Sequence, residues 1–217
     1  MNSQPVLQPP QPPRIAGWLL MLFTPAAVTD SIIGDLLEEF SGLVTRSGLA
    51  FARRWYWRQT LRTIAHASGS AVSSAPWLIL ISVLGGWWLI GFATRSSAHA
   101  MHTFLDARHL YESHPSAYLF WLKFPLEIGR VMVCGLTGVI VALASKRMEM
   151  ITVIGISLVQ IALFLTAVVA VIARGQAWSQ WFIAMLPWNG LCSIATVAGG
   201  VIVRTYRHRT ETRSSAA

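Results

Sequence analysis

The chain contains few charged residues and very few acids. Only 12% of its 217 residues are charged, and 9 are acidic. Hydrophobic residues make up 54% of the chain, and its mean hydropathy is positive. This is more apolar surface than the core of one soluble domain needs, which argues against an ordinary soluble protein and predicts a membrane protein.

Cysteine is also scarce. The two cysteines, Cys134 and Cys192, both fall inside apolar runs, where a thiol usually behaves as a small buried hydrophobe. They therefore say nothing about the redox compartment. The chain has no recognised zinc motif and no nucleophile–base pair on the inner face of the expected membrane segments, so we expect neither an enzyme nor a cofactor.

Basic residues outnumber acids, 17 to 9, which gives a net charge of +8. Such a charge can indicate nucleic-acid binding, but the basic residues here lie beside apolar segments and form no separate basic domain. In a membrane protein, the same excess marks segments held on the cytosolic side, facing anionic lipid. We expect a lipid bilayer, and no nucleic acid, as partner.

The first residues, 1–13, contain five prolines between Gln4 and Pro13 and no apolar periodicity, which predicts a disordered tail. A short apolar helix is expected over Arg14–Phe23. Its length is too small for a hydrocarbon core about 30 Å thick, which takes roughly 20 helical residues. A signal peptide ending at Pro25-Ala26-Ala27 is an alternative, but the basic opening typical of such peptides is missing.

Two further helices are expected before the first long apolar run. The first is capped by Thr29 or Asp30 and ends at Gly48, and its apolar residues recur every three or four positions. That row should pack against Trp18, Leu19 and Leu22. The second helix covers 50–67. It places an arginine row beside an apolar row and should lie along the inner membrane surface. The two rows are Arg54, Arg58 and Arg62, and Trp57, Leu61 and Ile64. Residues 14–70 are therefore predicted to form a small cytosolic helical domain.

Four apolar segments are long enough to cross a membrane. They cover about 76–94, 126–145, 150–173 and 182–203, so the fold class is all-α, with a four-helix transmembrane domain over 76–203. The N-terminal region, the second loop and the C-terminal tail together hold 12 Lys and Arg residues, whereas the other two loops hold 3, with Lys123 and Arg130 at the edge of the second span left out. The positive-inside rule then predicts cytosolic N- and C-termini, with 204–217 as a basic cytosolic tail.

The N-terminal region resembles a known domain. Its ordered elements are Ala16-Gly17-Trp18-Leu19-Leu20, Ile33-Gly34-Asp35-Leu36, Glu38-Glu39-Phe40 and Arg54-Trp55-Tyr56-Trp57-Arg58-Gln59. This order is similar to the permease prefix domain of duplicated orphan permeases. Those are bacterial proteins, best known from acidobacteria, that are similar to macrolide-exporter and lipoprotein-release ABC permeases. The resemblance covers roughly residues 14–65 and implies a bacterial inner-membrane location and an ABC permease or ATPase as a possible partner.

The rest of the chain departs from that family. A full permease of this kind places a large extracytoplasmic domain after its first span, whereas here residues 95–124 are expected to form only a modest loop. Transport activity is therefore not implied by the resemblance. The chain is interpreted as a prefix domain fused to a different four-helix membrane module.

Charged residues of the prefix-like region form the first candidate site. Asp35, Glu38 and Glu39 could be paired carboxylates for acid–base chemistry, but salt bridges to Arg54 and Arg58 across two packed helices explain them more simply. The neighbouring Trp55 and Trp57 suit either an interfacial aromatic belt or a partner-binding surface. We predict that a partner protein binds these seven residues, namely Asp35, Glu38, Glu39, Arg54, Trp55, Trp57 and Arg58.

Two other groups could carry chemistry. The expected outer loop contains His99, His102, His109 and His114 with Asp106 and Glu112; their spacing fits no recognised zinc motif, so we expect exposed histidines and no metal. Lys123, Glu127 and Arg130 share a helix face at the outer edge of the second span, which predicts an interfacial charge stripe. The deeper polar and small residues, which include Gln160, Thr196 and Gly199, suit helix packing.

Together these features predict an integral inner-membrane accessory or interaction protein that acts beside an ABC-type export system. The alternative is a small transporter, a channel or a metal-sensing membrane protein. A transporter requires polar groups at the membrane midplane, whereas an interaction protein does not. That difference separates the two hypotheses.

Overall fold

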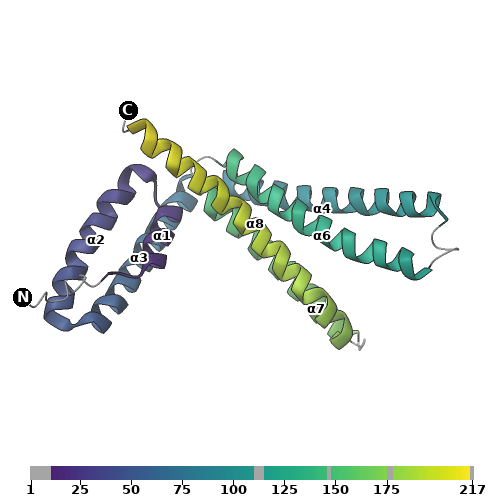
Figure 1. The fold of residues 1–217 in the computed structure, drawn as a ribbon, viewed down its shortest axis with the longest axis horizontal. Helices are drawn as coiled ribbons and strands as arrows, with labels where there is room; N and C mark the ends of the chain where they lie inside the picture. Colours follow the sequence, from purple (N-terminus) through teal and green to yellow (C-terminus); the bar gives the residue numbers. More distant parts are fainter. Residues whose placement is uncertain (1–10, 110–114, 146–147, 175–177, 216–217) are drawn as a thin grey trace, which may run out of the picture. The chain divides into compact units, whose positions relative to one another are not determined.

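The computed structural model describes residues 11–109, 115–145, 148–174 and 178–215. Over these ranges the chain is helical and contains no β-strand, which confirms the all-α fold class. The helices are α1 Arg14–Phe23, α2 Ala26–Ser47, α3 Leu49–Ser74, α4 Pro76–Ala107, α6 Pro115–Ala144, α7 Glu149–Ala173 and α8 Trp178–Ser215 (Figure 1). The chain divides into two compact units. One contains α1–α3 and the end of the chain from His208, and the other is Ala75–Arg207. The expected proline-rich tail lies largely outside the described residues.

The turn between α1 and α2 differs from the expected cap. Helix α2 begins at Ala26, directly after Pro25, and the expected cap at Thr29 or Asp30 is wrong. Proline fixes φ and lacks an N–H group, so it suits the position before a helix. The buried Thr29 hydroxyl instead donates to the Pro25 carbonyl at 2.8 Å and lies 2.9 Å from the Thr24 hydroxyl. The threonine pair therefore closes the turn.

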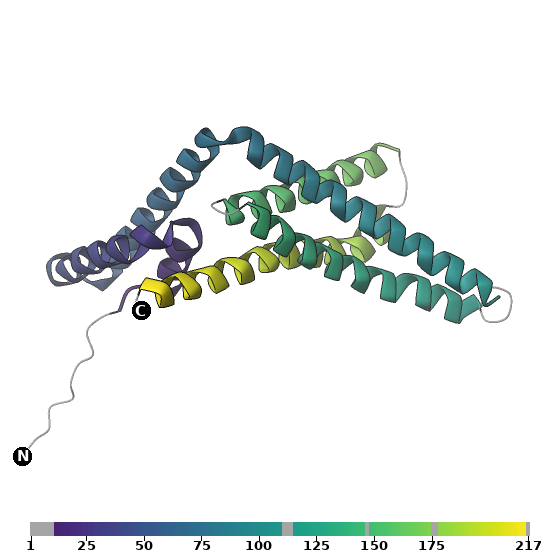
Figure 2. The same ribbon diagram turned by 90° about the horizontal axis from the view of Figure 1, so that it is seen from above.

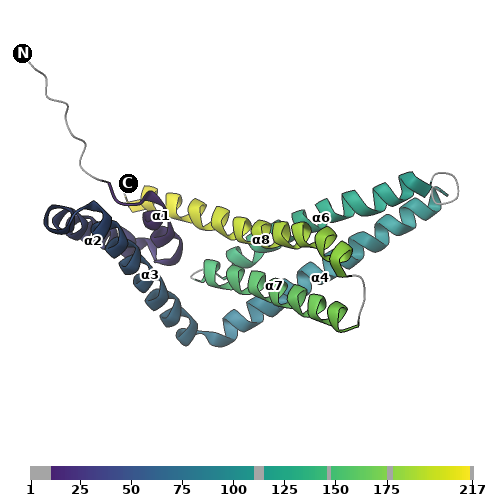
Figure 3. The ribbon, with the colours of Figure 1, turned by 90° about the horizontal axis from the view of Figure 1, so that it is seen from below.

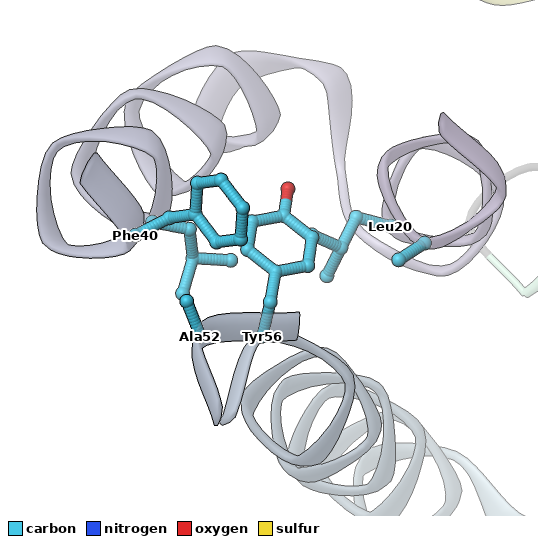
Figure 4. Packing of buried hydrophobic residues seen from close by; sticks show 6 residues of the cluster. Leu20, Phe40, Ala52 and Tyr56 are labelled. Atoms are coloured by element: carbon cyan, nitrogen blue, oxygen red, sulfur yellow. The ribbon is translucent and has the colours of Figure 1, made fainter. Parts of the chain in front are cut away.

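The N-terminal unit has its own core, in which Leu20 of α1, Phe40 of α2 and Tyr56 of α3 converge (Figure 4). The rings of Phe40 and Tyr56 meet edge to face, with centroids 5.8 Å apart, a geometry that the aromatic quadrupoles favour. Burial raises the pKa of the Tyr56 hydroxyl. The expectation that α1 packs through Trp18, Leu19 and Leu22 is wrong for Trp18, which is half exposed. Leu19 is half-buried and Leu22 is buried, but Leu20 is the leucine of α1 in this core.

The predicted salt bridges between α2 and α3 are also wrong. Asp35, Glu38 and Glu39 are exposed, as are Arg54 and Arg58. No ion pair joins these five described residues. The charged side chains project into solvent on two separate helices.

Helix periodicity explains why those charges do not meet. The residues of α3 that face the core are Ala52, Tyr56 and Thr60, and each arginine of the row lies two positions further along. Two residues correspond to roughly 200° around an α-helix, so the arginines lie opposite the packed face. On α2, Glu38 is likewise two positions from Leu36, which is buried.

In the second unit, four helices are long and apolar enough to cross a membrane, judged by length and composition. Their candidate spans are Pro76–Ala107, Phe124–Ala144, Glu149–Ala173 and Met185–Thr210. Many large apolar side chains on these helices are exposed, among them Trp77, Ile81 and Ile194. In lipid such side chains contact acyl chains, so this surface suggests a multi-pass membrane protein.

Helices α4 and α6 run side by side in opposite directions, as Figures 2 and 3 show. The predicted loop after the first span is wrong over most of its length, since α4 continues to Ala107 and α6 begins at Pro115. No glycine or proline occurs between Phe92 and Ala107, so the helix continues well past the expected end of the span. At the ends of the two helices, the Tyr118 hydroxyl lies 3.3 Å from His102 Nδ1 and donates to Asp106 at 3.4 Å.

Glycines allow the membrane helices to approach closely. At Gly138 of α6 an added Cβ would collide with the Thr196 carbonyl of α8, and at Gly199 of α8 it would collide with the Gly135 carbonyl. Gly200 approaches Val153 of α7 in the same way, with 3.0 Å between the added Cβ and the valine methyl carbons. The expected helix-packing role of Thr196, Gly199 and Gly200 is confirmed.

We predict that Gly138→Ala lowers the free energy of unfolding by about 2 kcal/mol, because the new methyl group meets backbone that cannot move aside. Gly129→Ala on the same helix is the matched control, since an added Cβ there meets nothing within 4 Å. The control should be neutral or slightly stabilising. Denaturant unfolding in detergent micelles measures both variants, and equal stability of the two would contradict the α6–α8 contact.

Candidate functional site

A chain of polar side chains runs through the second unit, at the contact of α6, α7 and α8. We call it the thiol chain. It consists of Glu127, Arg130 and Cys134 of α6, Gln160 of α7 and Cys192 of α8.

The thiol chain begins with an ion pair inside α6. Arg130 Nε lies 3.3 Å from Glu127 Oε2, and only 22% and 16% of the two side chains are exposed. Arg130 Nε also donates to Cys192 Sγ at 3.4 Å. The expected interfacial charge stripe is therefore wrong for these two residues. Arg130 is one turn from Cys134, on the side of α6 that packs against α8, and it points into the unit.

The chain continues through the two thiols. Cys134 and Cys192 belong to one buried cluster and are 1% and 4% exposed. Gln160 then donates its amide N–H to Cys134 Sγ at 3.6 Å. The Ser157 hydroxyl, one turn before Gln160, donates to the Ser193 carbonyl at 3.3 Å and ties α7 to α8 beside the thiols.

The thiol chain lies deep within the expected bilayer. Cys134 is midway along Phe124–Ala144, and Gln160 is close to the middle of Glu149–Ala173. Several of its polar atoms have no hydrogen-bond partner among the described residues: an Arg130 terminal nitrogen and Gln160 Oε1 have none, and Glu127 Oε2 has only its ion pair with Arg130. Buried polar atoms without partners cost about 1–3 kcal/mol each, so this arrangement is not explained by stability alone.

A second polar cluster joins the ends of three helices. Glu149, at the first position of α7, is only 3% exposed and is ion-paired with Arg207 and, at 3.5 Å, with Arg204 of α8. Arg207 also donates to the Leu143 carbonyl of α6 at 2.9 Å. A carboxylate at a helix N-terminus is favoured by the helix dipole. We interpret this cluster as a clamp that fixes the ends of α6, α7 and α8.

Sequence reasoning missed both arrangements. It treated the cysteines as isolated hydrophobes and assigned Arg204 and Arg207 only to a basic tail. A signal for the clamp was available, because Glu149 is an acid directly preceding an apolar span that otherwise has no charge. No comparable signal pairs Cys134 with Cys192, since they are far apart in sequence.

The residues predicted for partner binding have mixed surroundings. The five charged ones are exposed, whereas Trp55 and Trp57 are partly buried against the N-terminal core. The tryptophans thus contribute to packing within their own unit. Between them, Tyr56 is fully buried in that core.

The histidines do not form a metal centre among the described residues. His99, His102 and His109 are exposed, and the first two lie on α4 rather than in a loop. His114 and Glu112 are outside the described residues.

We predict that Glu149→Gln destabilises the protein by about 3 kcal/mol. This is the lower end of the cost of breaking a buried ion pair, because Arg207 retains 24% exposure. Glu39→Gln, which changes an exposed acid in the same way, should shift stability by less than about 0.5 kcal/mol. Denaturant unfolding measures both, and a Glu149→Gln protein as stable as its control would show that the clamp is not an energetic contact.

Comparison with family models, with curated proteins and with solved structures gave no match. The similarity to the permease prefix domain therefore stays a prediction based on the order of its motifs. The function has to be argued from the geometry of the chain itself.

Proposed function

We propose that the protein is a non-catalytic accessory protein of the bacterial inner membrane, which binds an ABC-type export permease or its ATPase through the N-terminal unit. One observation carries this proposal. The acids of α2 and the arginines of α3 are exposed and form no ion pairs with one another, although they belong to one compact unit with its own core.

Charges held apart in this way are suited to recognition. Exposed ion pairs contribute only about 0–1 kcal/mol to folding, so unpaired charges cost the unit little. Across an interface, however, complementary charges steer association and exclude wrong partners. Two separate stripes of opposite sign would orient a partner that carries the reverse pattern.

The similarity to a permease prefix domain supports the choice of partner. In that family the domain is attached to the permease itself, whereas here it is joined to a four-span membrane unit. An accessory protein that brings the same domain to the export system from a separate chain accounts for this combination. The basic residues beside the spans support cytosolic termini, on the side where an export ATPase works.

One observation favours a second function, a small transporter, channel or metal-sensing membrane protein. The thiol chain places polar groups near the middle of the expected bilayer, and ionisable groups there are costly and often functional. Transporters characteristically bind their solutes at this depth.

The first experiment tests the orientation of the protein in the membrane. In a variant without the native cysteines, Ser97→Cys near the outer end of α4 should react with a membrane-impermeant thiol reagent in intact cells. Ser73→Cys, which precedes α4, should react only after the membrane is permeabilised. Both serines are exposed. Labelling of Ser73→Cys in intact cells would reverse the proposed topology.

Partner binding is tested by crosslinking in native membranes. A photoreactive residue at Arg58 should capture an ABC permease or ATPase, and the same residue at Thr45, exposed on α2 two turns beyond Glu38, should capture much less. Combining the Arg58 probe with Glu38→Lys and Glu39→Lys should reduce capture at low salt, because the rim charges act mainly on association.

Unchanged capture after charge reversal would contradict recognition through the acidic stripe. Capture of no export component by the Arg58 probe would reject the proposed partner. Solute movement by the purified protein in vesicles would favour the second function instead.

A further inference from the structure

The two cysteines of the chain, far apart in sequence, meet inside the membrane unit. Cys134 of α6 and Cys192 of α8 belong to one buried cluster. The close approach of α6 and α8 at Gly138 and Gly199 brings the two residues into this cluster. Two thiols are thus held together near the middle of the bilayer, shielded from water.

Each sulfur accepts a hydrogen bond from a nitrogen. Arg130 Nε donates to Cys192 at 3.4 Å, and Gln160 Nε2 donates to Cys134 at 3.6 Å. A neutral thiol is only a weak acceptor. An arginine inside a membrane span is costly, and a weak acceptor offsets little of that cost. The donors are better matched to negatively charged sulfur.

Some buried polar atoms beside the two sulfurs also make no hydrogen bond to the described residues. An Arg130 terminal nitrogen and Gln160 Oε1 are buried without a hydrogen-bond partner among the described residues. These atoms lie on the two side chains that donate to the sulfurs. These unpaired atoms indicate that the polar interactions around the sulfurs are complete only when the sulfurs carry charge or hold a ligand.

We infer that Cys134 and Cys192 form a two-sulfur binding site for a soft monovalent metal ion, Cu(I), at the contact of α6 and α8. The inference is independent of the N-terminal unit and of its proposed partner. The proposed site does not include the histidines of α4.

The chemistry of the donor set selects the metal. Thiolates favour Cu(I), whereas hard cations such as Mg²⁺ and Ca²⁺ require oxygen ligands. Zinc sites in proteins are almost always four-coordinate or keep three protein ligands. The described residues offer no group of three or more metal-binding side chains. Two sulfurs suffice for the linear coordination that Cu(I) accepts.

Charge and protons balance in the binding step. Two Cu–S bonds form and two S–H bonds break, with no change in oxidation state, and the bis-thiolate complex carries one negative charge. Both released protons leave to solvent. Arg130, whose Nε lies 3.4 Å from Cys192 Sγ, then faces the anionic complex and offsets its charge.

Anaerobic titration of the intact, detergent-solubilised protein with Cu(I), in competition with a chromophoric Cu(I) chelator, tests the site. The wild-type protein should bind one equivalent, and its X-ray absorption spectrum should show two sulfur neighbours. Cys134→Ser and Cys192→Ser should each lose this binding. Gln160→Leu should keep the stoichiometry and weaken affinity by about tenfold, the effect typical of groups that orient a ligand.

Met132→Leu is the matched control, because Met132 is an exposed thioether on α6 and thioethers also bind Cu(I). This variant should bind like the wild type. Folding of the cysteine variants is checked by their melting temperature in the absence of metal. If wild-type protein does not compete with the chelator, or if either cysteine variant still binds one equivalent, the two-sulfur site is refuted.

Discussion

The close contact between α6 and α8 determines the arrangement of the membrane unit. It depends on Gly138 and Gly199, where a side chain of any size would strike the backbone of the opposite helix. Without a hydrophobic force between helices in lipid, association depends on such van der Waals contact and on polar bonds. The same close approach brings Cys134 of α6 and Cys192 of α8 into one buried cluster.

Two polar systems in this interface differ in what they contribute. The Glu149 clamp matches one acid with two arginines at the ends of helices, and its groups have strong partners. The thiol chain instead lies deeper, and several of its atoms lack a hydrogen-bond partner among the described residues. The clamp is accounted for by structure, because it fixes three helix ends. The unsatisfied groups of the thiol chain point to a ligand.

The N-terminal unit is stabilised in a different way from the membrane unit. Its helices are held by an apolar core around Tyr56, and the charged side chains of α2 and α3 project outward. Three helices bury little area, so such a unit is marginal by itself. Binding to a partner or to the membrane surface would add the missing stabilisation, which is consistent with a role in recognition. The functions proposed for the two units do not compete, because they involve different residues.

The sequence by itself determined the helical fold class and the number of long apolar helices, since both depend on local composition and on periodicity along one segment. It also determined the bounds of α1. It did not determine which side chains meet. The salt bridges expected for Glu38 and Arg58 fail because each residue faces away from the packed helix surface. The meeting of Cys134 with Cys192, and of Glu149 with Arg207, depends on the rotation and register of neighbouring helices. Only the tertiary structure fixes these, through backbone contacts that glycine permits.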